Sequence, residues 1–180
     1  PMKRHIEATQ GLTKNFFDRD VKIVARDLLG CGLCVRSRQG QIKRQVISET
    51  EAYDGEKDLA CHASRGRTAR NEVMYGPSGY CYVYLCYGVH WLLNVVTGSM
   101  GYPAAVLIRG SQEIEGPGRL TKSLGVDGSF NGSKLSKRNR LWIEPKEARV
   151  THIRSGPRVG VDYAGEHWAK VPYRFWFSKG

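Results

Sequence analysis

The amino-acid sequence predicts an α+β fold: one domain built on a curved antiparallel β-sheet with a few short helices. The first observation is composition, because 41% apolar residues in a chain of 180 residues are enough to form a single core. The second is pattern, since short segments with the period-two alternation of strands outnumber segments with helical periodicity. The sequence contains no repeats or linkers, so we expect one domain over residues 14–180, preceded by a flexible arm over residues 1–13.

The first elements that the sequence predicts are a helix and a β-hairpin. Asp20 can cap a helix over residues 21–29, and Gly30 can end it, because Gly readily adopts the left-handed conformation found there. Residues 31–38 and 41–53 alternate as strands do, and a Gln-Gly turn joins them. These two strands therefore form the first predicted hairpin.

A second hairpin, another helix and several short strands are predicted further along the chain. Residues 80–86 and 91–96 flank a Tyr-Gly-Val turn, and residues 104–109 continue the sheet. Gly116-Pro117 opens a helix that ends at Gly125, because Pro is favoured in the first turn and Gly just past the last. The remaining strand candidates are residues 141–144, 149–153, 158–161 and 173–177.

The charge balance indicates a polyanionic partner. Lys and Arg number 28 against 17 Asp and Glu, a net charge of +11 that attracts polyanions at a distance. Nucleic acid is favoured over a membrane, because no basic amphipathic helix, membrane-spanning run or signal peptide is evident. Five cysteines are most simply reduced thiols, as expected in the nucleus of a eukaryote or the cytoplasm of a bacterium. Cys31 and Cys34 have metal-ligand spacing, but no second pair follows, so we expect no metal.

Several basic residues are candidates for phosphate contacts. The loop between the two predicted hairpins is long, and loops of this length are usually functional or disordered. It carries His62, Arg67 and Arg70. Arg119 stands in the first turn of the second predicted helix, where free backbone N–H groups can meet a phosphate. Arg109 is the last residue of a predicted strand and could bind a phosphate or make a structural hydrogen bond.

A carboxylate in the second strand is the candidate general base. Alternation along residues 41–53 places Glu49, Glu51 and Tyr53 on one face of the strand. A carboxylate beside aromatic rings loses hydration and can position a water as general base. Glu51 is the leading candidate and Glu49 its rival, while the alternative is an ordinary surface carboxylate on an edge strand.

Three aromatic side chains could form a slot for a planar base. Tyr53, His62 and Tyr84 are the candidates, and each stacked base gains about 1–3 kcal/mol from such rings. The alternative is a tyrosine-rich sheet face whose rings simply pack, which is our interpretation of Tyr82.

Two further residues have open interpretations. Tyr87 lies at the tip of the second predicted hairpin, where a large ring is difficult to bury. It is either a wedge pushed between base steps or an ordinary exposed tyrosine. Asn94, in the returning strand, could recognise a base edge by donating or accepting a hydrogen bond, or could make only structural hydrogen bonds.

The sequence resembles the alkyladenine (3-methyladenine) DNA glycosylase family. The resemblance covers nearly the whole chain from about Asn15, and the motifs occur in order at sensible spacing. The matching motifs are Glu49-Thr-Glu51-Ala-Tyr53, His62-Ala-Ser-Arg65-Gly-Arg67-Thr-Ala-Arg70-Asn71, Tyr82-Val-Tyr84-Leu-Cys-Tyr87-Gly88, Asn94, Val106-Leu-Ile-Arg109, Gly116-Pro-Gly-Arg-Leu120 and Arg158-Val-Gly-Val-Asp-Tyr-Ala-Gly165.

The resemblance implies a monofunctional glycosylase that flips a damaged purine out of duplex DNA and leaves an abasic site. Glu51 would activate the water that attacks the sugar. Tyr53, His62 and Tyr84 would sandwich the flipped purine, and Asn94 would obstruct the exocyclic amine of guanine. The lesions implied are 3-methyladenine, 7-methylguanine, hypoxanthine and ethenoadenine.

Further expectations concern DNA contacts and assembly. The resemblance implies a protruding β-hairpin whose Tyr87 enters the duplex where the base left, and a phosphate contact from Arg109. We expect Arg67, Arg70 and Arg119 to contact the DNA backbone as well. The protein would act as a monomer on double-stranded DNA containing damaged purines, without a cofactor or a metal.

Some residues depart from the family pattern, and some alternatives remain. His90, Trp91 and Arg119 differ from the residues that are common at these positions, which affects DNA grip or substrate range but not the reaction class. A zinc nucleobase deaminase is excluded, because it needs the combined H-x-E and P-C-x-x-C pattern, and the sequence contains no P-C-x-x-C. The alternative to an enzyme is a non-catalytic protein that binds damaged or single-stranded DNA.

Overall fold

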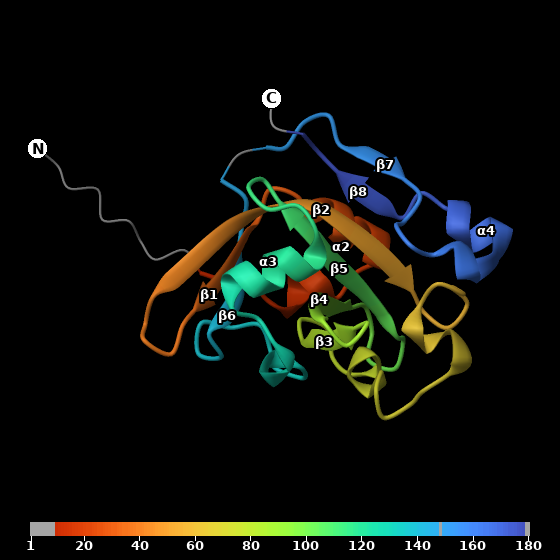
Figure 1. Ribbon diagram of the computed structural model, residues 1–180, viewed down its shortest axis with the longest axis horizontal. Coiled ribbons are helices and arrows are strands. Elements are labelled where there is room, and N and C mark those ends of the chain that lie inside the picture. The colour runs from red at the N-terminus through yellow and green to blue at the C-terminus, as the bar shows by residue number, and fades with distance from the viewer. Residues whose placement is uncertain (1–9, 148, 179–180) are drawn as a thin grey trace, which may run out of the picture.

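The computed structural model describes residues 10–147 and 149–178, which form the predicted α+β fold (Figure 1). The helices are α1 (Lys14–Phe17), α2 (Val21–Asp27), α3 (Pro117–Leu124) and α4 (Gly165–Lys170). The strands are β1 (Gly32–Arg36), β2 (Ile42–Asp54), β3 (Cys81–Cys86), β4 (His90–Thr97), β5 (Ala104–Ser111), β6 (Leu141–Glu144), β7 (Arg154–Gly156) and β8 (Arg174–Trp176). Short 3₁₀ turns are η1 (His62–Arg65), η2 (Glu72–Tyr75), η3 (Gly128–Phe130) and η4 (Asp162–Ala164).

One long strand, β2, organises the antiparallel sheet. The strand order is β3-β4-β5-β2-β1-β6, and β8 pairs with both β2 and β7. The first half of β2 pairs with β1, whereas its second half pairs with β5 and β8. The register between β2 and β5 shifts on both sides of Glu49, which marks a β-bulge where the strand passes from one half of the sheet to the other. The second half of β2 is therefore surrounded by other strands, and this is the half that carries the candidate base.

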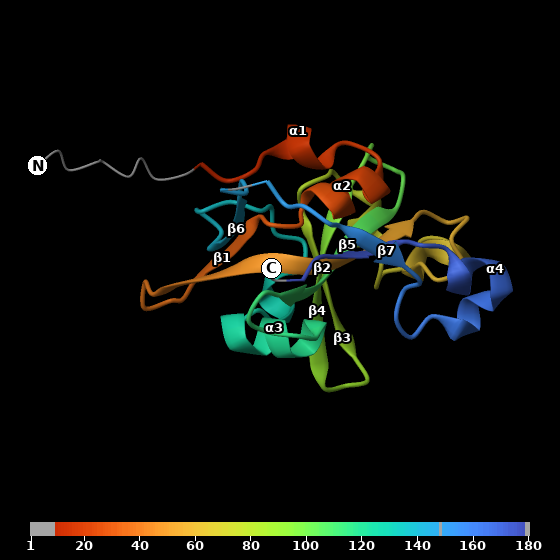
Figure 2. The same cartoon turned by 90° about the horizontal axis from the view of Figure 1, so that it is seen from above.

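Helices cover both faces of the sheet (Figure 2). Figure 2 shows α2 on one side and α3 on the other, with the β3–β4 hairpin projecting beyond α3. The main core contains Val24 of α2, Leu28 directly after this helix and Ile108 of β5. A smaller core contains Met74 and Tyr82, and it lies beneath the loop that follows β2. This second core supports the wall of the candidate site.

Local signals in the sequence locate the two longer helices correctly. The Asp20 side chain accepts a hydrogen bond from the backbone N–H of Lys22 at 2.9 Å and so caps α2. The predicted end is two residues late, because α2 ends at Asp27. The α3 helix ends as predicted, and Gly125 beyond it is left-handed with φ 75°.

Two predicted strands, residues 149–153 and 158–161, are wrong. His152 is left-handed with φ 56°, which interrupts the extended run that apolar alternation suggests. The second segment turns at Gly160, where φ is 72°, and the N–H of Val159 donates to a side chain rather than to a neighbouring strand. The strand of this region is β7, which pairs with β8.

The structure adds two short helices that the sequence pattern did not indicate. Both α1 and α4 lie in segments for which the sequence predicts no helix or strand. Both are too short to show a helical period. Residues 1–9 of the predicted N-terminal arm lie outside the described residues, while Leu12 donates its backbone N–H to Ile143 of β6 at 2.7 Å.

Residues 10–147 and 149–178 contain neither a membrane-spanning helix nor a metal-binding cluster. No helix there has the length and apolar character needed to cross a bilayer. No group of three His, Cys, Asp or Glu side chains in the same ranges could hold a metal ion. Cys31 and Cys34 are buried free thiols.

Candidate active site

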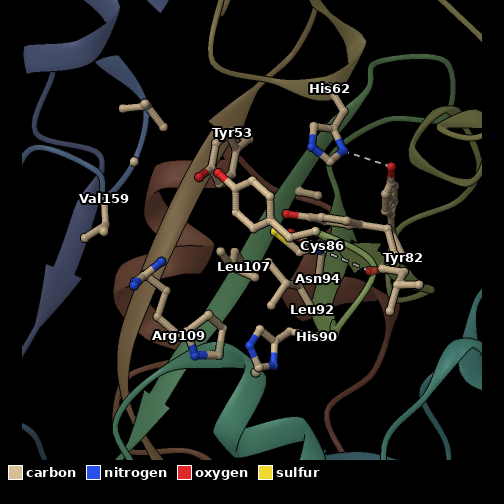
Figure 3. Close-up of a pocket in the computed structure, with 18 of the residues that line it drawn as sticks. Tyr53, His62, Tyr82, Cys86, His90, Leu92, Asn94, Leu107, Arg109 and Val159 are labelled. Carbon is tan, nitrogen blue, oxygen red and sulfur yellow. Dashed lines mark hydrogen bonds between the residues drawn. The ribbon is translucent and has the colours of Figure 1, made fainter. Parts of the chain in front are cut away.

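The predicted site residues meet around one cavity of about 560 Å³ (Figure 3). It opens between the β3–β4 hairpin, β5, the first turn of α3 and the segment after β7. Its volume lies in the range of small-molecule sites, and its wall combines aromatic rings with a few polar groups. The predicted residues that line it are Tyr53, His62, Arg70, Tyr84, Tyr87, Asn94, Arg109 and Arg119.

Glu51 lies one layer behind the cavity wall, with its side chain fully buried. One carboxylate oxygen accepts a hydrogen bond from the Tyr53 hydroxyl at 2.9 Å and lies 3.5 Å from the Arg109 guanidinium. The other oxygen accepts from the backbone N–H of Val159 at 2.6 Å. All three partners line the cavity. The carboxylate is therefore separated from the cavity only by the groups that hold it.

Burial raises the pKa of Glu51 above its ordinary value of 4.5. The nearby Arg109 charge, the Val159 N–H and the Tyr53 hydroxyl act in the opposite direction, because each favours the charged carboxylate. A carboxyl group with a raised pKa beside a cavity is a typical candidate for proton transfer.

Glu49 has a different environment from Glu51. It is a quarter exposed, and its two oxygens lie 2.9 Å from Arg109 and 3.3 Å from Arg174. Its charge is therefore shared between two guanidinium groups. The structure agrees with the prediction that Glu49, Glu51 and Tyr53 share one side of β2, because Arg109 contacts both carboxylates and Tyr53 contacts Glu51.

Arg109 faces carboxylates in this structure. Its Nε donates to Glu49, its Nη1 approaches Glu51, and the side chain is only 15% exposed. A phosphate contact from this residue stays a prediction, and it would have to compete with these two ion pairs.

Aromatic rings enclose the cavity from more than one side. The centroids of His62 and Tyr84 are 4.4 Å apart in an edge arrangement, and Tyr53 reaches the cavity from β2 (Figure 3). His62 Nδ1 lies 3.0 Å from the hydroxyl of Tyr82, which is fully packed, as its interpretation as a core residue requires. Burial and the positive charge of Arg70 lower the pKa of His62, so the ring is neutral at neutral pH.

A buried asparagine holds the loop that presents His62. Asn71 donates from its side-chain amide to the backbone carbonyls of His62 at 3.1 Å and Gly66 at 2.9 Å. Its side-chain oxygen accepts from the backbone N–H of Thr68 at 2.7 Å. One side chain, which the sequence shows only as part of a motif, thus ties three parts of the long loop together.

Asn94 and Tyr87 occupy different depths of the same hairpin. Asn94 is buried in β4, lines the cavity, and donates from its side-chain amide to the Tyr82 carbonyl at 3.1 Å. Tyr87 is 94% exposed at the hairpin tip and is left-handed with φ 51°, an unusual conformation for a residue other than Gly. The turn therefore directs a large ring away from the body of the protein.

The remaining predicted arginines have separate environments. Arg70 donates to the Leu85 carbonyl at 3.3 Å and so links the loop to the hairpin. Arg119 lines the cavity from the first turn of α3. Arg67 pairs with exposed Glu72 at 3.0 Å and lies outside the cavity lining.

The two aromatic departures from the family pattern pack against glycines. A Cβ atom on Gly118 would lie 2.8 Å from His90, which places that ring against the start of α3. A Cβ atom on Gly128 would lie 2.7 Å from Trp91. His90 lines the cavity, whereas Trp91 packs against the main core.

Comparison with known proteins gives a consistent assignment. A methylpurine-DNA glycosylase family model matches residues 15–115 and 111–180. A relative from Myxococcus xanthus is 46% identical over 175 residues, covering 92% of this chain and 89% of the relative. One from Methanocella arvoryzae is 43% identical over 185 residues, covering 92% and 91%. A third, from Legionella pneumophila, is 42% identical over 174 residues, covering 93% and 94%.

All three relatives carry the name "Putative 3-methyladenine DNA glycosylase". The family match extends over nearly all of the chain from residue 15, and so includes the cavity and every residue that holds Glu51. The chain therefore belongs to the methylpurine-DNA glycosylase family of DNA-repair hydrolases.

Proposed function

We propose that this protein excises damaged purines from duplex DNA by hydrolysing the N-glycosidic bond with a water that Glu51 activates. The observation that carries the proposal is a buried carboxylate with a raised pKa directly behind a cavity lined by aromatic rings. The substrates are 3-methyladenine, 7-methylguanine, hypoxanthine and ethenoadenine, and the product is an abasic site. The protein acts as a monomer on double-stranded DNA in the compartment that holds the genome, without a cofactor.

Base capture uses the aromatic part of the cavity. Unstacking and unpairing a base costs a few kcal/mol, and less at a damaged or mismatched pair. Stacking on Tyr53, His62 and Tyr84 offsets this cost. An alkylated purine carries positive charge, so it also gains from cation–π attraction to electron-rich tyrosine rings.

Bond cleavage uses the carboxylate behind the wall. The water oxygen bonds to the sugar C1′ while a water proton passes to Glu51, and the electrons of the C1′–N bond leave with the base. A cationic alkylpurine leaves as a neutral molecule and needs little help. A neutral nucleobase such as hypoxanthine is a poorer leaving group, so its excision depends more strongly on the general base, Glu51.

Asn94 supplies selection against undamaged guanine. Its side-chain amide is buried at the cavity wall and is held by the Tyr82 carbonyl, so it cannot move freely away from an incoming base. The exocyclic amine of guanine would meet this fixed group, whereas adenine-derived lesions and hypoxanthine carry no amine at that position. The amine of 7-methylguanine would meet it too, so excision of this lesion relies on its positively charged, readily leaving base.

Release of free base tests the proposal directly. Duplexes containing hypoxanthine or 3-methyladenine are incubated with the protein, and the free base and the intact abasic strand are measured. A non-catalytic damage-binding protein would retain the duplex but release no base. Strand cleavage without added alkali would contradict a monofunctional enzyme.

Excision of hypoxanthine should fall at acid pH. Because only the ionised carboxylate accepts a proton, the rate falls as pH drops through the raised pKa of Glu51, by about tenfold per pH unit below it. The acid limb of the pH–rate profile, where the rate falls, should therefore lie above pH 4.5, the ordinary pKa of a glutamate. Single-turnover rates with saturating enzyme measure it. A rate that rises on acidification through this range would instead make Glu51 a proton donor.

Tyr87→Ala should weaken capture of the flipped base without unfolding the protein. The ring is 94% exposed, so its removal should change stability by no more than about 0.5 kcal/mol. Thermal unfolding and the fluorescence of an ethenoadenine duplex measure the two effects. Val89→Ala, on the same hairpin and 69% exposed, is the matched control and should leave capture intact. A large loss of stability in Tyr87→Ala would show that the ring has a structural role.

A further inference from the structure

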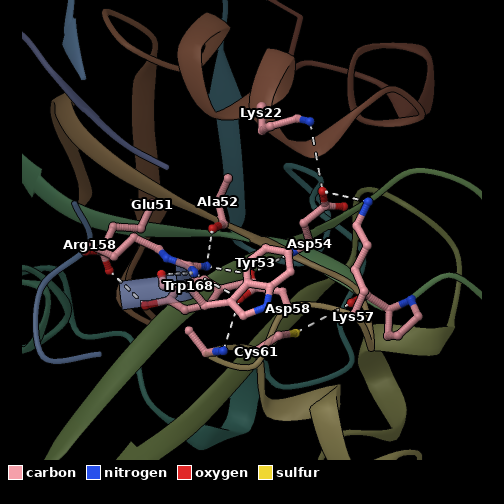
Figure 4. Close-up of polar contacts among 12 residues, drawn as sticks. Lys22, Glu51, Ala52, Tyr53, Asp54, Lys57, Asp58, Cys61, Arg158 and Trp168 are labelled. Atoms are coloured by element: carbon pink, nitrogen blue, oxygen red, sulfur yellow. Dashed lines mark hydrogen bonds and ion pairs between the residues drawn. The ribbon is translucent and has the colours of Figure 1, made fainter. Parts of the chain in front are cut away.

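The motif that begins at Arg158 has no role in the mechanism derived above. Its first residue forms an ion pair with Asp58, and both side chains are fully buried (Figure 4). The contact is bidentate: Nη2 donates to Asp58 Oδ1 at 2.9 Å, and Nη1 donates to Oδ2. Neither residue lines the cavity. A role for this pair must therefore pass through other residues.

The pair joins two regions of the chain about 100 residues apart: the end of β2 with the loop after it, and the segment from Arg158 to α4. Arg158 also donates to the carbonyls of Ala52 in β2, at 2.9 Å, and Trp168 in α4, at 3.2 Å. Asp58 accepts from the backbone N–H groups of Asp54 and Ala60, both at 3.0 Å. We call the Arg158–Asp58 pair and these four hydrogen bonds the clamp. Ala52 stands between Glu51 and Tyr53 in the sequence, so the clamp holds β2 directly beside the candidate general base.

Stability alone is a poor explanation for this pair. Removing two charges from water costs free energy that their attraction often does not repay, and apolar replacements can be neutral or stabilising. The Nε of Arg158 also has no hydrogen-bond partner in the described residues. A group that is costly to bury and incompletely satisfied suggests a purpose other than holding the fold.

Two of the three groups that hold Glu51 depend on Arg158. The backbone N–H of Val159, the next residue, donates to Glu51 at 2.6 Å. The guanidinium carbon of Arg158 lies 4.8 Å from the centre of the Tyr53 ring, whose hydroxyl donates to Glu51 at 2.9 Å. The ion pair fixes the Arg158 backbone, and the guanidinium packs against the Tyr53 ring. Both contacts help to place the Val159 N–H and the Tyr53 hydroxyl where they donate to the Glu51 carboxylate.

We propose that Arg158 and Asp58 are positioning residues, whose ion pair sets the Val159 N–H and the Tyr53 hydroxyl on the Glu51 carboxylate. This inference rests on the proposed role of Glu51 as general base. Hydrogen bonds to a carboxylate favour its charged form. If the clamp is loosened, less Glu51 is ionised at neutral pH, and excision slows without loss of DNA binding.

Other charged and titratable groups besides the Arg158–Asp58 pair surround Glu51. They come from the neighbouring strands and from the cavity wall. These groups are Arg109 of β5, Glu49 and Tyr53 of β2, Arg174 of β8, Tyr84 of β3 and Tyr163 of η4. The Arg158 charge also interacts with Glu51, so a variant that keeps this charge is needed to report the effect of the hydrogen bonds alone.

Arg158→Lys is the test variant, because Lys keeps the charge but cannot bond both Asp58 oxygens and both carbonyls. Single-turnover excision of hypoxanthine is measured against pH, together with lesion-duplex affinity and thermal unfolding. We expect the acid limb to move up by about one pH unit, which is tenfold in the ionised fraction below the limb. The rate should approach that of the unaltered protein as pH rises, with affinity unchanged within about twofold.

Arg44→Lys is the matched control. Arg44 pairs with Glu144 at 3.2 Å on the half of the sheet away from the cavity, so this variant should lower stability without moving the acid limb. A rate that is reduced equally at every pH, or an unmoved limb in folded Arg158→Lys, overturns the inference.

A second variant covers the case in which Arg158→Lys fails to fold. Asp58→Asn combined with Arg158→Met leaves no unpaired buried charge, and it should move the acid limb in the same direction. An unmoved limb in this double variant also overturns the inference. Failure of the proposed function would look different, because Glu51→Gln would then remain active whatever the clamp variants do.

Discussion

Glu51→Gln should lower the single-turnover rate of hypoxanthine excision by at least about 10²–10⁴-fold, the usual contribution of a general base. Gln keeps the size and the acceptor oxygen that meets the Tyr53 hydroxyl, but it cannot take a proton from water. The loss should be smaller for 3-methyladenine or 7-methylguanine, whose cationic bases leave readily. Lesion binding should persist, because Glu51 is behind the cavity wall and does not line it.

The same substitution should remove a loss of stability that grows with pH. Burial raises the pKa of Glu51, so the folded protein binds this proton more tightly than the unfolded chain. Stability from such a group is lost as pH rises through the folded pKa, and the ionised residue is therefore unfavourable at neutral pH. As pH rises above 4.5, the unfolding temperature of the unaltered protein should fall relative to that of Glu51→Gln. The variant is itself less stable by a pH-independent amount, because its amide NH2 meets the Val159 N–H where Glu51 offers an acceptor.

Glu49→Gln is the matched control on the same side of β2. The amide oxygen of Gln can still accept from Arg109, so we expect excision to stay nearly intact. An inactive Glu49 variant together with an active Glu51 variant would reassign the general base. Full activity of both variants on hypoxanthine would remove carboxylate catalysis from the mechanism.

Affinity for undamaged duplex should fall steeply with salt. Each phosphate contact contributes a slope of about −0.9 to log affinity against log salt, because binding releases condensed counterions. Arg109 is held by two carboxylates and is largely buried, whereas the pair of Arg67 with Glu72 is exposed and weak, so Arg67, Arg70 and Arg119 are left of the four predicted contacts. Three contacts predict a slope of about −2.7, or roughly 40-fold weaker binding between about 50 and 200 mM salt.

Single substitutions resolve the origin of this slope. Arg119→Gln should reduce its magnitude by about one contact, because Arg119 lies at the cavity rim on α3. Arg19→Gln is the control: Arg19 pairs with Asp27 at 2.9 Å and lies between α1 and α2, across the sheet from α3 (Figure 2). A slope near zero in the unaltered protein would contradict phosphate binding. A larger change of slope in Arg19→Gln than in Arg119→Gln would indicate that DNA binds the opposite face of the sheet.

Local pattern was sufficient for most of the fold. Period-two alternation predicted both hairpins and put Glu51 and Tyr53 on the same side of β2, because neighbouring positions on a strand face are a property of the strand alone. Caps and turn residues predicted α2, α3 and the exposed tip at Tyr87 for the same reason. The strands predicted at residues 149–153 and 158–161 failed because apolar alternation does not report backbone reversals.

Only the tertiary structure decided the environment of the candidate base. Glu51 is buried because β5 and β8 flank its strand, and it is held by the N–H of Val159, which is 108 residues away in the chain. A backbone N–H has no sequence signature, since every residue except Pro carries one. The pairing of Arg109 with carboxylates, and of Arg158 with Asp58, likewise depends on which segments pack together. Residue types and spacing identified the chemical groups, whereas burial and long-range hydrogen bonds, which exist only in the folded chain, determine how tightly Glu51 holds its proton.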